Sequence, residues 1–169
     1  VLSKATKLKV ISRHGVGYDN VDTSYLKHNN ITLLITATAN AIAVSEHVFY
    51  LMLAISKNFL NLDNEVRIGN FKNNMNKFET FELHNKEILI VGFGRIGKNL
   101  IKKCLAFQMN VKVYDPFVEE KIINDMGGKK VDNFDEALKT LDFLSLHMPL
   151  NKNTKDLINL KKMKTMKNT

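Results

Sequence analysis

The sequence has 169 residues, of which 44% are hydrophobic and 25% are charged, a composition typical of a globular protein with a sizeable core. No apolar run approaches the roughly 18 residues that a membrane-spanning helix needs, and no signal peptide is recognisable, so we expect no membrane partner. The formal net charge of +8 could indicate a nucleic-acid partner, but the excess consists of scattered lysines, with arginine only at Arg13, Arg67 and Arg95. Nucleic-acid readers favour arginine and aromatic residues gathered in one patch, so we expect no nucleic-acid partner.

Two further observations concern the compartment and the ends of the chain. Cys104 is the only cysteine and falls in an apolar helical pattern, so we expect a small core residue, no disulfide and a reducing cytoplasm. The chain begins at Val1 instead of a methionine and stops at Thr169 in the middle of a pattern. We therefore expect both ends to continue in a longer protein.

The first part of the chain alternates between strand and helix patterns. In order, the residues predict a strand at 7–12, a glycine-containing loop at 14–20, a short helix at 22–30 capped by Asp22, and a strand at 31–36. Apolar residues then recur at spacings of three and four from about residue 43 to residue 68, which predicts one long amphipathic helix that ends at Gly69. Such a length is unusual for a globular helix, so we expect it to bridge two lobes.

The second part of the chain predicts parallel βαβ units, because strands and helices alternate at short intervals after a connector at 70–85. The strands are predicted at 87–92, 111–115, 129–132 and 142–149, and the helices at 95–108, 118–127 and 133–141. The densest run of lysines, 159–168, is interpreted as the solvated side of a helix that packs on Leu160, Met163 and Met166.

Three glycines lie between the strand at 87–92 and the helix that follows, in the sequence ILIVGFGRIGKNL. Gly92 allows a tight turn, Gly94 lets a pyrophosphate approach the backbone, and Gly97 lets the helix pack closely on the strand. The N–H groups and partial positive charge at the start of the helix would face the phosphates. This loop therefore predicts a dinucleotide site.

The type of dinucleotide is indicated by Asp115, which ends the next strand about 20 residues after the loop. Its carboxylate can accept hydrogen bonds from the adenine-side ribose hydroxyls and would repel a 2′-phosphate, which favours NAD over NADP. The alternative is that Asp115 only caps the turn before Pro116. Arg95, at the start of the helix, either lies along the pyrophosphate or is a surface residue.

Five segments, in the same order along the chain, resemble the D-isomer-specific 2-hydroxyacid dehydrogenases. They are LKVISRHGVGYDNVD (8–22), TANAIAVSEHVFYLML (38–53), ILIVGFGRIGKNL (88–100), VYDP (113–116) and DFLSLHMPLNKNTKDLIN (142–159). The resemblance implies an α/β fold. Residues 70–169 would form a Rossmann-type doubly wound parallel sheet, truncated at its C-terminus. Residues 41–69 would be an interdomain helix, and residues 1–40 the end of a flavodoxin-like substrate-binding domain.

The resemblance also implies two sets of site residues. The substrate carboxylate would be held by the backbone of one loop and by residues near it: Arg13, His14, Gly15, Val16, Gly17 and Asn40. The cofactor would be bound by Val16, Gly92, Gly94, Arg95, Ile96, Gly97, Asp115, His147, Met148, Pro149 and Thr154. Asn85 stands where the family usually has glycine, and because asparagine tolerates a left-handed backbone we expect the turn to survive there.

The function implied by the resemblance is reversible hydride transfer between NAD and C2 of a D-2-hydroxyacid, by a homodimer or homotetramer without a metal. The resemblance favours 3-phosphoglycerate, in serine biosynthesis, and leaves glyoxylate, hydroxypyruvate and lactate open. The catalytic Arg, Glu and His of the family would lie beyond residue 169, so we expect this chain alone to bind NAD weakly and not to turn over. A function of another class stays open, that of an NAD-sensing corepressor built on the same fold.

Overall fold

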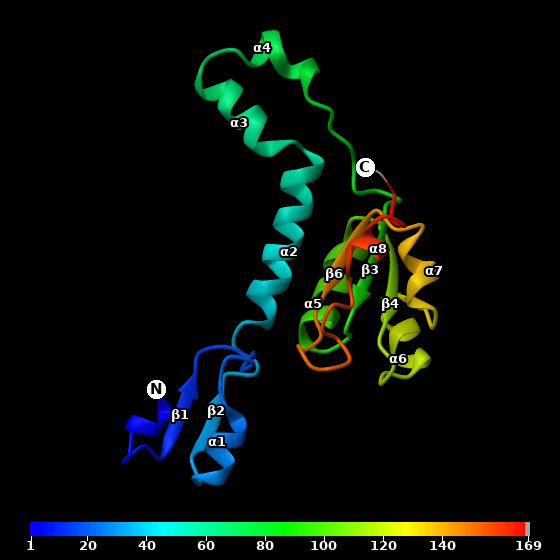
Figure 1. Cartoon of the computed structure of the whole chain (residues 1–169). Coiled ribbons are helices and arrows are strands. Elements are labelled where there is room, and N and C mark those ends of the chain that lie inside the picture. The colour runs from blue at the N-terminus through cyan, green and yellow to red at the C-terminus, as the bar shows by residue number, and fades with distance from the viewer. Residues whose placement is uncertain (168–169) are drawn as a thin grey trace.

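The computed structural model describes residues 1–167, in which two parallel sheets are joined by a long helix and an arm of shorter helices (Figure 1). The strands are β1 (Val10–Arg13), β2 (Thr32–Ile35), β3 (Glu87–Val91), β4 (Asn110–Tyr114), β5 (Lys129–Lys130) and β6 (Phe143–Leu146). The α-helices are α1 (Thr23–His28), α2 (Ala41–Ser56), α3 (Phe59–Arg67), α4 (Phe71–Asn74), α5 (Arg95–Ala106), α6 (Glu120–Asp125), α7 (Phe134–Leu138) and α8 (Leu160–Met163). Among the helices of this described part of the chain, none combines the length and apolar character that crossing a bilayer demands.

The first sheet contains β1 and β2, which run parallel with Val10 paired to Thr32. Helix α1 makes the crossover between the two strands. It begins where Oδ1 of Asp22 accepts a hydrogen bond of 2.9 Å from the N–H of Tyr25. The predicted strand–helix–strand order and the predicted cap are therefore confirmed.

The second sheet has the strand order β5-β4-β3-β6, and all its pairs are parallel. The chain runs from β3 outward to β4 and β5, and then returns to place β6 on the other side of β3. This reversal makes the sheet doubly wound, which confirms the predicted Rossmann-type arrangement. In such sheets ligands bind beyond the carboxyl ends of the strands at the point of reversal, here between β3 and β6.

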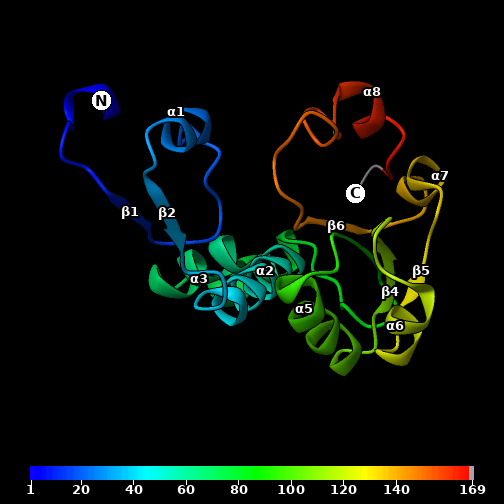
Figure 2. The same ribbon diagram turned by 90° about the horizontal axis from the view of Figure 1, so that it is seen from below.

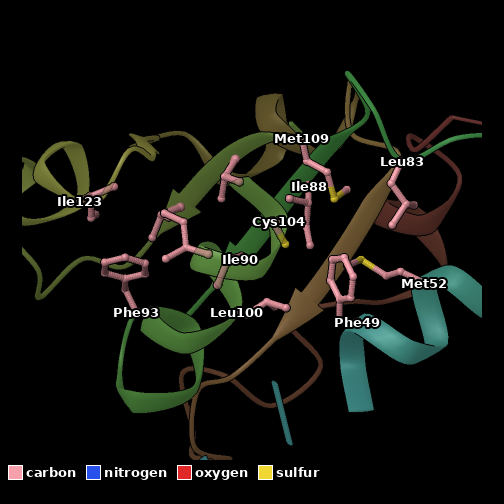
Figure 3. Packing of buried hydrophobic residues seen from close by; sticks show 13 residues of the cluster. Phe49, Met52, Leu83, Ile88, Ile90, Phe93, Leu100, Cys104, Met109 and Ile123 are labelled. Atoms are coloured by element: carbon pink, nitrogen blue, oxygen red, sulfur yellow. The ribbon is translucent and has the colours of Figure 1, made fainter. Parts of the chain in front are cut away.

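The central strand β3 separates two hydrophobic cores, because successive side chains of a strand point to opposite faces. Ile88 and Ile90 pack with α2 and α5 on one face (Figure 3), whereas Leu89 and Val91 pack with α7 on the other. Cys104 of α5 is fully buried in the first core, as predicted. Burial raises the pKa of its thiol to about 12, so it is not poised as a nucleophile.

The prediction of one continuous helix over residues 41–69 is wrong, because α2 and α3 are separate helices. Between them Asn58 has a φ of +49°, a left-handed conformation that asparagine adopts more readily than most residues and that interrupts the helical hydrogen bonds. The bend is anchored to the connector. The Nδ2 of Asn58 donates to the carbonyl of Glu79 at 3.4 Å, and Nζ of Lys57 donates to the carbonyl of Phe81 at 2.9 Å.

Left-handed turns in and around the connector agree with the predictions. Gly69, where the helical pattern was expected to stop, follows α3 with a φ of +76°. Asn85 has a φ of +61°, so the turn survives without glycine. Residues 70–85 are not wholly irregular, since they contain α4 and a 3-10 turn at Met75–Lys77.

The predicted packing of the lysine-rich tail is largely wrong. Leu160 and Met163 of α8 are 69% and 56% exposed. The side chain that turns inward is instead Lys162, whose Nζ lies 2.8 Å from a carboxylate oxygen of Asp135 and 4.8 Å from the ring centroid of Phe134. Cation–π and ion-pair contacts therefore hold this segment, together with partly buried Met166. The last two residues of the predicted helix and domain, 168–169, lie outside the described residues.

Candidate cofactor-binding site

A cavity of about 400 Å³ lies at the carboxyl ends of β3, β4 and β6, where the doubly wound topology favours ligand binding. Its lining comes from the glycine loop, from the turn after β4 and from the long loop after β6. The lining residues are Val91, Gly92, Gly94, Tyr114, Asp115, Pro116, Phe117, His147, Met148, Pro149, Asn151, Asn153, Thr154 and Leu157.

The three glycines of the loop have different surroundings. Gly92 has a φ of +93°, and a Cβ there would lie 2.7 Å from the carbonyl carbon of His147. A Cβ on Gly97 would lie 2.5 Å from the carbonyl oxygen of Gly92, so the close packing of helix on loop requires glycine. A Cβ on Gly94 would meet no atom within 4 Å. The protein itself therefore requires the first and third glycines, while the second faces open space.

The start of α5 is suited to an anion. Gly94 is its N-cap and makes no side-chain capping bond, and the first turn holds no acidic residue. The N–H groups of the first turn are thus available, and they carry the positive end of a helix 12 residues long. Arg95 and Ile96 form this turn, with Arg95 exposed and Ile96 half-buried.

The carboxylate of Asp115 ties the glycine loop to the end of β4. Its Oδ2 accepts a hydrogen bond of 2.7 Å from the N–H of Phe93, between the first two glycines, and its Oδ1 accepts one of 2.9 Å from the N–H of Phe117. The turn-capping role considered as the alternative is therefore present. Each carboxylate oxygen keeps a further lone pair, so the same side chain can also accept bonds from a ribose. That second role stays a prediction.

The loop after β6 is built around His147 and Thr154. The N–H of His147 donates to the carbonyl of Val91 at 2.7 Å, and its Nε2 lies 2.8 Å from Oγ of Ser145. Burial lowers the pKa of His147 below its ordinary value, so the ring is neutral at pH 7. Oγ1 of Thr154 donates to the carbonyl of Pro149 at 2.6 Å, which closes the loop over the cavity.

The loop predicted to hold the substrate carboxylate is partly engaged with itself. The N–H of Gly15 donates to Oγ1 of Thr36 at 2.7 Å, and Nε of Arg13 donates to the carbonyl of Gly17 at 2.8 Å. Within residues 1–167, the N–H groups of Val16 and Gly17 have no protein acceptor. The loop therefore offers these two donors, and its arginine serves the loop's own shape.

Asn40 carries an unusual buried atom. It occupies the N-cap position of α2, but its side chain makes no capping bond. Its Oδ1 is the only buried side-chain polar atom without a hydrogen-bond partner in the described residues. A buried acceptor without a partner typically costs about 1–3 kcal/mol, so the Asn40 side chain is held at an energetic cost.

The two predicted sets of residues lie on adjoining parts of the molecule. Nη1 of Arg95, beside the glycine loop, donates to the carbonyl of Ala37, between β2 and α2, at 3.4 Å. Further along, Nζ of Lys103 donates to Oγ of Ser45 at 3.0 Å, and α2 packs along α5 (Figure 2). The first sheet thus presents its loops beside the start of α5, where the cofactor phosphates are expected.

The cavity gathers part of the residues predicted for the cofactor: Gly92, Gly94, Asp115, His147, Met148, Pro149 and Thr154. Other predicted residues do not line it: Val16, Arg95, Ile96 and Gly97, and the substrate set Arg13, His14, Gly15, Gly17 and Asn40. Phe117 was not among the predicted residues, but it lines the cavity and is 94% exposed although it is large and apolar. The sequence feature that could have indicated it is an aromatic residue directly after Asp115 and Pro116, which follow β4.

Comparisons with known proteins agree with this geometry. The profile of the family "D-isomer specific 2-hydroxyacid dehydrogenase, NAD binding domain" matches residues 49–169. D-3-phosphoglycerate dehydrogenase of Methanocaldococcus jannaschii is 35% identical over 167 residues, and glyoxylate reductase of Thermococcus litoralis is 35% identical over 172 residues. Among solved structures, D-lactate dehydrogenase of Aquifex aeolicus in complex with NAD and lactic acid has 32% identity and a TM-score of 0.86, covering 98% of this chain and 49% of that one.

Each of the two sequence relatives aligns with 99% of this chain, but the chain spans only 32% and 52% of their respective lengths. The relatives act on different acids according to their names, so they do not single out one substrate. The predicted family and the predicted cofactor are confirmed, since the family profile is that of an NAD-binding domain and covers most of the chain. The chain belongs to the D-isomer specific 2-hydroxyacid dehydrogenase family, and its residues 49–169 correspond to the NAD-binding domain of that family.

Proposed function

We propose that this chain is the cofactor-binding part of an NAD-dependent dehydrogenase, and that the whole protein interconverts a D-2-hydroxyacid and its 2-keto acid. The observation that carries the proposal is the glycine loop, where Gly94 leaves open space at an uncapped helix start and Asp115 lines the same cavity. Helix starts of this kind bind phosphate groups. When bound, NAD supplies the hydride acceptor for oxidation at the hydroxyl carbon.

The residues around the cavity have separate proposed roles toward the cofactor. Gly92, Gly94 and Gly97, with Arg95 and Ile96, would hold the pyrophosphate at the start of α5. Asp115 would accept hydrogen bonds from the ribose hydroxyls, and its charge would disfavour the 2′-phosphate of NADP. The remaining cofactor contacts would come from Val16, His147, Met148, Pro149 and Thr154.

The substrate is proposed to lie between the glycine loop and the loop at residues 13–17. The N–H groups of Val16 and Gly17 are donors suited to a carboxylate. The side-chain amide of Asn40 would contact the substrate only after a change of rotamer, because its Oδ1 is buried. We propose a substrate lobe at 1–40, a linking region at 41–69 and a cofactor domain at 70–169, with the later part of the linking region, from residue 49, within the span of the family profile. Arg13, His14 and Gly15 would then shape the pocket wall.

The proposed substrate of the whole protein is 3-phosphoglycerate. It is supported by the D-3-phosphoglycerate dehydrogenase of M. jannaschii among the relatives and, weakly, by the lysine excess, which suits a phosphorylated acid. Glyoxylate is the second candidate, because the T. litoralis glyoxylate reductase is equally similar. The ratio of kcat/KM for 3-phosphohydroxypyruvate and for glyoxylate, both reduced with NADH by the whole protein, decides between them.

The exposed side of helices α2 and α3 is proposed to contact a second copy of the chain. Large apolar side chains along it are strongly exposed, among them Ile55 at 66%, Leu60 at 77% and Val66 at 59%. Monomeric proteins seldom leave so many apolar side chains together in water. Light scattering of the whole protein should give at least the mass of a dimer, and Leu60→Glu should lower it, whereas a monomer at micromolar concentration would contradict the proposal.

The cofactor assignment is tested by titrating the chain with NADH and with NADPH while following nicotinamide fluorescence. We expect NADH to bind and NADPH to bind at least about tenfold more weakly, a difference of about 1.4 kcal/mol, because Asp115 repels the extra phosphate. Lys102→Ala, on the exposed face of α5, serves as the control and should leave both affinities unchanged. Absence of NADH binding would overturn the proposal. Peptide binding that depends on NADH, without turnover by the whole protein, would instead favour a corepressor.

A further inference from the structure

We propose that Thr36 is a positioning residue: it holds the loop at residues 14–17 in the shape that binds the substrate carboxylate, and its neighbour Ala37 joins that loop to the cofactor helix. The inference rests on the proposed function, in which the loop contacts the acid. Thr36 itself would touch neither the substrate nor the cofactor. It would act through Gly15.

The contact between Thr36 and Gly15 involves both backbone groups of the glycine. The N–H of Gly15 donates to Oγ1 of Thr36 at 2.7 Å, and the N–H of Thr36 donates to the carbonyl of Gly15 at 3.2 Å. The hydroxyl of Thr36 points back toward the same carbonyl at 3.5 Å. One residue, 21 positions further along the chain, therefore fixes the peptide groups on both sides of the Gly15 Cα.

Gly15 needs such a constraint. Its φ is +118°, and an ideal Cβ there would meet no atom within 4 Å, so packing at this position does not fix the backbone. Glycine has more conformational freedom than any other residue, and a loop hinged on it samples many orientations unless hydrogen bonds select one. The direction of the donors that follow it, the N–H groups of Val16 and Gly17, therefore depends on the hydrogen bonds of Thr36, together with the bond from Nε of Arg13 to the carbonyl of Gly17.

The segment after Thr36 connects this loop with the cofactor site. The carbonyl of Ala37 accepts a hydrogen bond of 3.4 Å from Nη1 of Arg95, the first residue of α5. Three residues later, Asn40 presents its unpartnered buried Oδ1 at the start of α2. A single short segment thus carries both hydrogen bonds to Gly15 and the contact with the cofactor helix.

The hydroxyl is the element that a substitution can remove cleanly. Thr36→Val has nearly the same shape and deletes the hydroxyl, which removes the acceptor for the N–H of Gly15 and the weaker contact with the Gly15 carbonyl, whereas Thr36→Ser keeps both. Because Thr36 is exposed, neither change is expected to affect the core. The loss of one such hydrogen bond corresponds to about a fivefold change in an equilibrium constant.

The experiment uses the whole protein with 3-phosphoglycerate as the acid substrate. It measures kcat, the KM of that acid, the affinity for NADH, and the binding of oxalate, a carboxylate that cannot be reduced, to the NADH complex. For Thr36→Val we expect the acid's KM to rise and oxalate binding to weaken by about fivefold, with NADH affinity and thermal stability unchanged. Thr36→Ser should restore both. Thr36→Ala repeats the deletion in case the valine variant folds poorly.

Two outcomes overturn the inference while leaving the proposed function intact. The first is a valine variant whose acid KM and oxalate affinity equal those of the wild type while NADH binds normally. The second is a serine variant as impaired as the valine variant, which would mean that the hydroxyl is not the active element. Failure of the wild-type protein to bind NADH would instead overturn the proposed function, so the two failures are distinguishable.

Discussion

Alanine at Gly94 and alanine at Gly97 should have opposite effects, because one glycine is required by the fold and the other only by the ligand. At Gly97 the new Cβ would lie 2.5 Å from the carbonyl oxygen of Gly92 and 3.3 Å from Cγ2 of Ile90. A backbone carbonyl cannot turn aside, so α5 has to move off the sheet. Overpacking of this kind costs about 1–3 kcal/mol, and so short a contact places the cost near the upper end.

The net effect on stability follows from two opposing terms. Alanine at Gly97 regains about 1 kcal/mol, because it favours the helix more than glycine does. We therefore expect Gly97→Ala to lose about 2 kcal/mol of unfolding free energy, or roughly 4–8 °C in Tm for a chain of this size. At Gly94 the φ of −78° suits alanine and no atom lies within 4 Å of the Cβ, so the main cost is the poorer N-cap preference of alanine, about 0.5–1 kcal/mol and well below the cost at Gly97.

Binding should show the reverse pattern to stability. The Cβ of Gly94→Ala occupies the space through which a pyrophosphate would approach the backbone, and we expect NADH affinity to fall at least about tenfold, equivalent to about 1.4 kcal/mol. Urea denaturation and NADH fluorescence titration of both variants, with Lys102→Ala as the control, provide the comparison. The reasoning is refuted if Gly94→Ala binds NADH as well as the wild type, or if it unfolds as easily as Gly97→Ala.

Three further predictions concern the cavity mouth, the helix break and the acid end of the pH range. Phe117→Ala should weaken NADH binding by about 1–3 kcal/mol, which is the usual contribution of one base stacked on an aromatic ring. It should not lower Tm, because the ring is 94% exposed. Titration with NADH and thermal melting check both results, and an unchanged affinity would show that the ring does not contact the cofactor. Asn58→Ala should cost about 1–2 kcal/mol in urea denaturation because alanine tolerates the left-handed conformation poorly, whereas Asn58→Gly should be close to neutral. Burial raises the pKa of Asp142, but the hydrogen bond from the N–H of Glu87 and the ion pair with Lys167 outweigh it, so the pKa lies below its ordinary value of 3.8. The stabilisation from this carboxylate is therefore complete above the unfolded-state pKa and is lost as the pH falls through the lowered folded-state pKa. Asp142→Asn should accordingly show a smaller loss of unfolding free energy below about pH 4 than the wild type. Urea denaturation at a series of acidic pH values measures this difference.

How far the sequence predicted the fold depended on whether the signal was local. The apolar pattern located β3 most clearly, because a strand buried on both faces of a parallel sheet is a continuous apolar run. The short strand β5, Lys129–Lys130, has no such pattern and was predicted from its place between two helices. The break at Asn58 was missed because the apolar period continues across it, and a single left-handed residue leaves no trace in that period. The inward turn of Lys162 was missed for a related reason. In the sequence Lys162 looks like the neighbouring solvent-exposed lysines, and only the folded structure brings Asp135 and the ring of Phe134 next to it.

The same distinction applies to the candidate site. The roles of Gly92 and Gly97 follow from a local strand–turn–helix geometry, which the motif specifies by itself. The hydrogen bonds between Thr36 and Gly15 and between Arg95 and Ala37 join residues 21 and 58 positions apart. No local sequence pattern around these residues indicates such contacts. Asn40 shows the consequence most clearly. The family resemblance placed Asn40 near the substrate, but only the folded structure reveals that its Oδ1 is buried without a partner, because that depends on how α2 meets the rest of the chain.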